Sequence, residues 1–300
     1  MPRAPWASCL MVVLVACSRP AAPTPDVADL TLQAPTRVPI LDELRPMIMV
    51  SADGRPVRAL VDSGAEGTQL DAATANALRL PLRPYANVSK MYGSTGHSVE
   101  LAHYVEFEDL RVGDLRLGPV RLPVVEADYG PASGIILGQD LLLRVVTIVD
   151  QGRRQLHLLP KASDSAAIVR YIEAEKIAEG AWAQVDADCR PCPHLRIELP
   201  GLEGPVDIEV DTGAASTGLP MRAIEALGLQ PLRETYTTGV GGRHDCHEYH
   251  TTLDLFGVAV SLDVHDLAID RGLLGMDVLS LFVVVLDGPG KKVWLHHRAK

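Results

Sequence analysis

The chain repeats itself, and this internal duplication constrains its fold more than any other feature. Residues 62–65 (Asp-Ser-Gly-Ala) and 211–214 (Asp-Thr-Gly-Ala) stand 149 positions apart, and leucines follow both at offsets of 8, 16 and 18 residues. Further on, residues 136–142 (Ile-Leu-Gly-Gln-Asp-Leu-Leu) correspond to residues 273–279 (Leu-Leu-Gly-Met-Asp-Val-Leu). Chance does not preserve so many offsets. We therefore interpret the chain as a tandem duplication, and its 300 residues are enough for two hydrophobic cores.

Each copy has the pattern of short strands joined by turns. Residues 195–199 and 206–210 alternate apolar and polar side chains, and Asp53-Gly54 is a hairpin-turn signal. Residues 72–80 and 221–229 predict short helices. The 25 glycines and 22 prolines also suit a turn-rich fold. We therefore expect a mainly β protein with short helices.

The two copies predict two domains with a linker between them. Residues 38–160 form the first domain, residues 161–187 the linker and residues 188–300 the second domain. Within the linker, residues 166–179 fit a helix, but their β-branched and aromatic side chains would also suit a strand. Both alternatives remain open at this point.

The N-terminus has the pattern of an export signal. A short apolar stretch ends at residues 14–17 (Leu-Val-Ala-Cys), which resemble the lipobox of bacterial lipoproteins. We expect residues 1–16 to be a signal peptide, Cys17 to be lipid-modified, and residues 17–37 to be a disordered tether. With Ser18 after the cysteine, the resemblance implies the periplasmic face of the outer membrane. A plain signal peptide with an incidental cysteine is the alternative.

The charge balance argues against one class of partner. The chain has 28 Lys and Arg residues against 38 Asp and Glu residues, a net charge of −10. Nothing in this balance would neutralise phosphates, so we expect no nucleic-acid partner. No apolar run reaches the length of a membrane-spanning helix. The lipid on Cys17 is therefore the expected link to the membrane.

The paired motifs identify a family. A strand that ends in Asp-Ser/Thr-Gly-Ala, followed later by two apolar residues and a glycine, resembles the retropepsin-like aspartic proteases (clan AA). The resemblance covers both copies and implies two tandem closed β-barrel domains of the acid-protease type, related by a pseudo-twofold axis. It implies that Asp62 and Asp211 are the catalytic pair. It also implies that the loops around them support the site through Ser63, Gly64, Ala65, Thr212, Gly213 and Ala214.

Two carboxyl groups in one site suit the hydrolysis of an amide. Like charges about 3 Å apart cannot both ionise, so the pair retains one proton. The ionised group can take a proton from water while the protonated group supports the carbonyl oxygen. We therefore expect a cell-envelope aspartic endopeptidase that acts on peptides or proteins. It should need no cofactor and should work as a monomer, because one chain carries both halves.

Two other functions remain open. A duplicated fold can keep its groove and lose turnover, which would leave an inactive peptide-binding lipoprotein. A metal-stabilised lipoprotein with a structural role is the third hypothesis. The resemblance further implies glycine-rich flaps over the substrate. Their tips would be formed by Tyr92, Gly93 and Gly96 in the first copy and by Gly239, Gly241 and Gly242 in the second.

A group of cysteines and histidines occurs in the second copy alone. Cys189 and Cys192 open this copy, and Cys246 and His250 follow its flap glycines. In an oxidising compartment we expect a disulfide between Cys246 and either Cys189 or Cys192. The same three thiols with His250 have the ligand types of a zinc site, which is the less favoured alternative. We therefore assign no metal to the protein.

Overall fold

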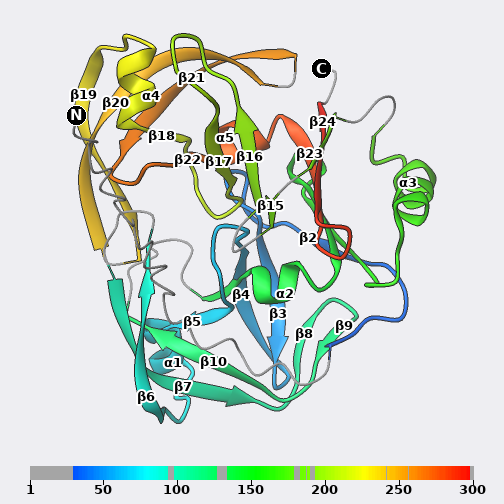
Figure 1. Ribbon diagram of the computed structural model, residues 1–300. Helices are drawn as coiled ribbons and strands as arrows, with labels where there is room; N and C mark the ends of the chain where they lie inside the picture. The colour runs from blue at the N-terminus through cyan, green and yellow to red at the C-terminus, as the bar shows by residue number, and fades with distance from the viewer. Residues whose placement is uncertain are drawn as a thin grey trace, which may run out of the picture.

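The computed structural model of the chain describes residues 30–93, 98–126, 134–178, 183–186, 188–189, 193–240, 242–255 and 257–297. Within these residues the protein is mainly β, as the sequence predicts, and consists of three sheets with short helices between them (Figure 1). None of the helices in this part of the chain combines the length and the hydrophobicity needed to cross a bilayer.

The first copy forms a ten-stranded sheet that curls into a half-barrel in the lower part of Figure 1. The predicted turn at Asp53-Gly54 is present, and both residues have positive φ (48° and 76°), as a two-residue hairpin turn requires. The strands lie in the order β1 (Leu30–Thr31), β9 (Leu115–Leu117), β8 (Leu110–Val112), β3 (Met47–Ala52), β4 (Arg55–Val61), β11 (Ile135–Leu137), β5 (Gln69–Asp71), β10 (Val120–Val125), β7 (Ser98–Phe107) and β6 (Arg83–Tyr92).

The second copy forms an eight-stranded sheet in the upper part of Figure 1. Its order from β16 onward repeats, strand by strand, the order of the first sheet from β3 onward. In both copies a short parallel strand, β11 or β22, lies beside the strand that leads into the Asp motif. The order is β15 (Asp188–Cys189), β16 (Pro193–Ile197), β17 (Val206–Val210), β22 (Gly272–Leu274), β18 (Gly218–Pro220), β21 (Val258–Leu267), β20 (Gly242–Leu255) and β19 (Pro231–Gly239).

A third sheet joins the two copies. The apolar runs that end each copy, β12 (Val146–Asp150) and β23 (Phe282–Asp287), pair with each other antiparallel, with Ile148 opposite Val285. All residues of both strands are buried, because side chains on both faces of the sheet are covered. The six strands lie in the order β14 (Ala183–Asp186), β24 (Lys292–His297), β23, β12, β13 (Gln155–Leu159) and β2 (Thr36–Pro39).

The linker contains a helix where the sequence left helix and strand open, and its residues 183–186 form strand β14 of the third sheet. Helix α3 (Ser165–Ala174) begins after Asp164, whose side chain accepts a hydrogen bond from the Ala167 N–H at 2.7 Å. Its Ile168 and Ile172 are buried in one apolar cluster with residues of the third sheet. The linker therefore covers one face of the sheet that joins the copies.

The remaining helices are short and occupy equivalent places in the two copies. The predicted helices over residues 72–80 and 221–229 are present and end a few residues early. The Asp71 side chain accepts a hydrogen bond from Thr74 N–H at the start of the first. These elements are the pair α1 (Ala72–Ala77) and α4 (Met221–Ala226) and the pair α2 (Gln139–Leu142) and α5 (Met276–Leu279). The 3-10 turn η2 (Gln151–Arg153) follows β12, and a turn without a helix follows β23.

The structure corrects the predicted tether at its C-terminal end. Residues 30–37 belong in part to β1 and β2, whereas the sequence assigned them to a disordered segment. Thr36 is buried, and its Oγ1 donates to Asp114 Oδ2 at 2.9 Å. Strands this short bury few side chains, so they produce no clear alternation of apolar and polar residues in a segment rich in proline. The signal peptide and Cys17 lie outside the described residues.

Candidate active site

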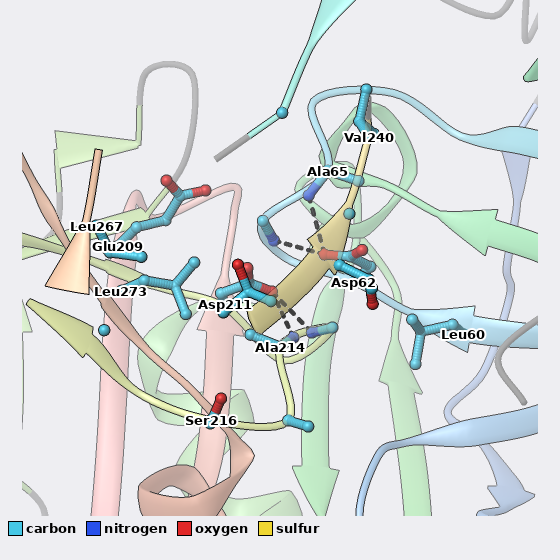
Figure 2. Close-up of a pocket in the computed structure, with 18 of the residues that line it drawn as sticks. Leu60, Asp62, Ala65, Glu209, Asp211, Ala214, Ser216, Val240, Leu267 and Leu273 are labelled. Carbon is cyan, nitrogen blue, oxygen red and sulfur yellow. Dashed lines mark hydrogen bonds between the residues drawn. The ribbon is translucent and has the colours of Figure 1, made fainter. Parts of the chain in front are cut away.

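Asp62 and Asp211 occupy equivalent positions at the ends of β4 and β17. The backbone N–H of Asp62 donates to the Leu137 carbonyl, and that of Asp211 donates to the Leu274 carbonyl, both at 3.0 Å. These carbonyls belong to the apolar-apolar-Gly segments of the two copies. These bonds anchor each Asp loop to a neighbouring parallel strand, which explains why the two copies share this spacing in the sequence. Figure 2 shows the two carboxyl groups side by side.

Each carboxyl group is held by the backbone of its own loop. Asp62 Oδ1 accepts hydrogen bonds from the N–H groups of Gly64 at 2.9 Å and Ala65 at 3.0 Å. Asp211 Oδ1 likewise accepts from the two residues that complete its motif, Gly213 at 2.8 Å and Ala214 at 3.0 Å. The two carboxyl groups lie close enough to interact directly. The sequence motif thus predicts both the residues and their role.

The motif glycines are required for a reason that the sequence does not reveal. A β-carbon on Gly64 would lie within 3.0 Å of the Asp211 carboxyl group, and one on Gly213 would lie within 3.0 Å of the Asp62 carboxyl group. Neither glycine has positive φ, so a tight left-handed turn is not the reason. Each glycine instead leaves room for the carboxyl group of the opposite copy.

Ser63 and Thr212 brace the two copies against each other. The Ser63 hydroxyl donates to the Val210 carbonyl at 2.6 Å and accepts from the Thr212 N–H at 3.0 Å. Thr212 Oγ1 makes the reciprocal contacts, donating to the Val61 carbonyl at 2.7 Å and accepting from the Ser63 N–H at 3.1 Å. Both side chains are fully buried. Four hydrogen bonds therefore fix the relative positions of the two Asp loops.

A second pair of supporting residues escaped the sequence analysis. Thr68 Oγ1 donates to Asp140 Oδ1 at 2.7 Å and accepts from the Gly138 N–H at 3.1 Å. In the second copy, Thr217 Oγ1 makes the same two contacts, to Asp277 Oδ1 at 2.7 Å and from the Gly275 N–H at 3.1 Å. The signal was present, because a threonine follows the Asp of each Asp-Ser/Thr-Gly motif by six residues, and an Asp follows the glycine of each apolar-apolar-Gly segment by two.

The surroundings of the two carboxyl groups favour a single shared proton. Burial raises the pKa of both groups above the usual 3.8, and the neighbouring carboxyl group raises the pKa of Asp62 further. The loop N–H groups oppose this by stabilising the charged forms. The Arg271 charge also lowers the pKa of Asp211. We infer that the two carboxyl groups share one proton, and that its titration belongs to the pair.

A pocket of about 370 Å³ lies over the pair. Its walls come from both Asp loops and from two hairpins, β6–β7 and β19–β20. From these hairpins, Met91 and Gly93 line it on one side and Tyr236 to Val240 line it on the other. The pocket therefore has the carboxyl pair at its base and residues near the tips of two hairpins in its walls.

The predicted flap residues lie on these two hairpins. Gly239 and Gly242 pair with each other at the turn between β19 and β20. Tyr92 is the last residue of β6, and its side chain lies outside the described part of the structure. Gly96 and Gly241 also lie outside it. The role of the hairpins as flaps stays a prediction.

The described members of the cysteine and histidine group form no metal site. Cys246 is buried in β20 as a free thiol, while Cys192 and the side chain of Cys189 lie outside the described residues. His250 Nδ1 lies 2.8 Å from Asp263 Oδ1, and Nε2 contacts a serine hydroxyl. Neither ring nitrogen is open to zinc in this arrangement, and no group of three or more metal-ligand residues occurs among the described residues. The disulfide stays a prediction.

Comparison with known proteins supports the same class of protein. Residues 48–141 match the family model described as aspartyl protease. This range holds the first Asp motif and the first Ile-Leu-Gly segment, so the resemblance to retropepsin-like aspartic proteases is confirmed there. No curated protein matches the chain.

Proposed function

We propose that the protein is an aspartic endopeptidase whose single active site is shared by the two copies. The observation that carries this proposal is the reciprocal arrangement at the dyad, where each motif glycine makes room for the opposite carboxyl group. A structural turn has no need of such an arrangement in two copies. We further propose that the copies are two acid-protease lobes related by a pseudo-twofold axis, which the repeated strand order supports.

The shared proton gives the two carboxyl groups complementary roles. The ionised carboxyl group acts as the general base that takes a proton from the attacking water, and the protonated one donates its proton to the carbonyl oxygen of the scissile amide. The first group then gives its proton to the amine nitrogen as the C–N bond breaks, and the second regains a proton from a hydroxyl group of the tetrahedral intermediate. The loop N–H groups hold both side chains in place throughout the reaction. The residues of the chain supply every step, so no cofactor is required.

The test is the replacement of each carboxyl group in turn. We expect Asp62→Asn and Asp211→Asn each to abolish the cleavage of a peptide library while the circular dichroism spectrum stays unchanged. Neither carboxyl group can perform both halves of the acid–base chemistry. Asp287→Asn is the matched control, because it changes a buried carboxyl group at the end of β23 that does not line the pocket. If either dyad variant retained near-normal turnover, the proposal would be wrong.

An inactive peptide-binding protein is the competing function. It predicts binding without cleavage in the wild type, together with affinity that survives Asp62→Asn. The intact motif in both copies favours the enzyme, because loss of function usually removes one of the two carboxyl groups. The same library therefore distinguishes the two functions, provided that binding is measured beside cleavage.

We also propose that the active unit is a monomer, held at the cell envelope by a lipid on Cys17. The pairing of β12 with β23 within one chain supports the monomer, and activity per mole should then stay constant on dilution to nanomolar concentration. Cys17→Ser should release the protein from membranes or block its processing. We place the lipid anchor at the periplasmic face of the outer membrane.

A further inference from the structure

The two copies line the pocket with different chemistry at equivalent positions. In the first copy, Leu60 pairs with Met47 on one neighbouring strand and with Ile136 on the other, and the three side chains form an apolar cluster. The equivalent positions in the second copy are occupied by Glu209, His194 and Leu273. Figure 2 shows Leu60 and Glu209 on opposite sides of the Asp pair.

The polar side of the pocket is built around Glu209. This side chain is only 6% exposed, and its Oε2 lies 3.3 Å from Arg271 Nε and 3.9 Å from His194 Nε2. A buried carboxylate needs such partners, because an unpaired one would be costly. Glu209 therefore holds the Arg271 side chain in one position. In the first copy the residue at the position of Arg271 is Gly134, which makes no equivalent contact.

On the polar side of the pocket, the Arg271 guanidinium is the group available to bind a substrate. Arg271 lines the pocket, and its side chain is 40% exposed. Its Nε faces Glu209, and a guanidinium has four further N–H donors in a planar fork that matches a carboxylate. The fixed stem reduces the conformational entropy that binding would otherwise cost. A second arginine, Arg45, also lines the pocket, and no ion pair links it to an acidic residue among those described.

We propose that the second copy forms a subsite for an acidic side chain of the substrate, Asp or Glu, which binds the Arg271 guanidinium. The first copy forms a subsite for an apolar side chain around Leu60. This inference rests on the proposed function, because it assigns the two sides of one peptide-cleaving site. The substrate class is therefore a peptide with an apolar residue on one side of the scissile bond and an acidic residue on the other.

The first experiment uses fluorogenic peptides that differ at one position. Glu, Gln or Lys is placed on one side of the scissile bond with Leu on the other, and the series is repeated with the sides exchanged. We expect kcat/KM for Glu to exceed that for Gln by about tenfold to a hundredfold, the range of a charged hydrogen bond. The preference should appear on one side alone. A preference for Lys would indicate that the substrate side chain binds Glu209 instead of Arg271, and would overturn the proposal.

The second experiment changes the subsite. Arg271→Ala should bring the Glu to Gln ratio close to one, and Arg271→Glu should favour Lys. Because either change removes the arginine partner of the buried Glu209, the double variant Glu209→Leu/Arg271→Ala serves where a single variant does not fold. It copies the apolar chemistry around Leu60, and should therefore favour Leu on both sides of the bond.

Two controls separate a subsite from general attraction by positive charge. Arg222→Ala removes an exposed charge that is paired with Asp270 at 2.6 Å outside the pocket, and should leave the ratio unchanged. Arg45→Ala removes a charge that lines the same pocket. If it lowered the ratio as much as Arg271→Ala did, the attraction would be diffuse and the subsite assignment wrong.

A binding measurement keeps this inference separate from the proposed function. The same Glu and Gln peptides, with a reduced CH₂–NH bond in place of the scissile amide, are titrated by fluorescence anisotropy. Binding without any cleavage of the parent peptides would overturn the endopeptidase, while a Glu preference lost in Arg271→Ala would still support the subsite. Equal affinity for Glu and Gln would overturn the subsite alone. Failure to bind either peptide would overturn both.

Discussion

Gly93, just after β6, lies directly against Val240, at the tip of the hairpin from the other copy. A β-carbon on Gly93 would lie 2.9 Å from Val240 Cβ and still closer to the Val240 carbonyl oxygen. Both residues line the pocket above the carboxyl pair. The two hairpins therefore meet over the carboxyl pair, and the contact is possible because Gly93 has no side chain.

This contact predicts that Gly93→Ala separates the hairpins. Because the added methyl group meets backbone atoms, which cannot yield as a flexible side chain would, we expect KM to rise about tenfold or more with little loss of stability. The matched control is Gly239→Ala on the other hairpin, where a β-carbon would meet nothing within 4 Å and φ is not positive. Peptide cleavage kinetics of the two variants provide the measurement. Equal KM values would show that the contact at Gly93 has no role in substrate binding.

The brace between Ser63 and Thr212 predicts a large and specific loss of stability. Thr212→Val keeps the shape of the side chain but leaves the Val61 carbonyl and the Ser63 N–H without their partner. Two buried unsatisfied groups cost about 2–4 kcal/mol in the free energy of unfolding.

Thr212→Ser is the matched variant, since it keeps the hydroxyl and removes one methyl group. We expect it to cost about 1 kcal/mol. Urea unfolding of the three proteins measures both values. If the valine variant proved as stable as the serine variant, the hydroxyl would have no bracing role.

Local patterns in the sequence predicted those parts of the site that depend on the chain's own repeat. The Asp motifs and the glycine segments recur at equal offsets, so their residues were identified by number. The physical reason for Gly64 was not predicted, because the atom that fills the space beside it belongs to Asp211 in the other copy. The polar side formed by Glu209 and Arg271 was missed for a similar reason. Glu209 and Arg271 are far apart in the sequence, and only the folded chain brings them together in one wall of the pocket.

The fold shows the same limit. Strands β12 and β23 are equivalent apolar runs in the two copies, but the sequence does not predict that they pair with each other. An apolar run indicates a strand buried on both faces without indicating its neighbour. The α3 segment was left open because Ile168 and Ile172 fit either periodicity, and packing against the third sheet decides for the helix.

Linkage predicts that the carboxyl pair makes the protein less stable as pH rises. The pKa of Asp62 is raised in the folded state by burial and by Asp211. A raised pKa contributes stability that is fully present below the unfolded value, near 3.8, and is lost as pH rises through the folded value. Asp62→Asn removes this titration. We therefore expect the variant to be more stable than the wild type at pH 7, with no difference near pH 3.

Unfolding by urea at several pH values measures this difference. Asp140→Asn is an informative control, because burial also raises the pKa of Asp140 but Thr68 donates to its charged form. The gain from replacing it should therefore be smaller. A wild type that was more stable than Asp62→Asn at pH 7 would contradict the raised pKa.

The pH dependence of activity should follow from the residue after each Asp-Ser/Thr-Gly. Ala65 and Ala214 donate to the carboxyl groups only through their backbone N–H groups, since a methyl side chain cannot donate a hydrogen bond. Pepsin-like enzymes usually carry a hydroxyl there, and a bond from it would favour the ionised form. Without it the pair keeps its shared proton to higher pH. The active form, with one proton on the pair, then persists into the weakly acidic range.

We therefore expect a pH–rate maximum between about 4.5 and 6.5 for peptide cleavage. Ala65→Ser and Ala214→Ser should each shift the profile to lower pH, because a donated hydrogen bond lowers the pKa of the adjacent carboxyl group. Ala65→Val, which adds bulk without a donor, separates the effect of the hydroxyl from that of size. The measurement is kcat/KM against pH for the four proteins. A wild-type maximum near pH 2 to 3, or an upward shift in either serine variant, would show that the missing hydroxyl does not set the proton affinity of the pair.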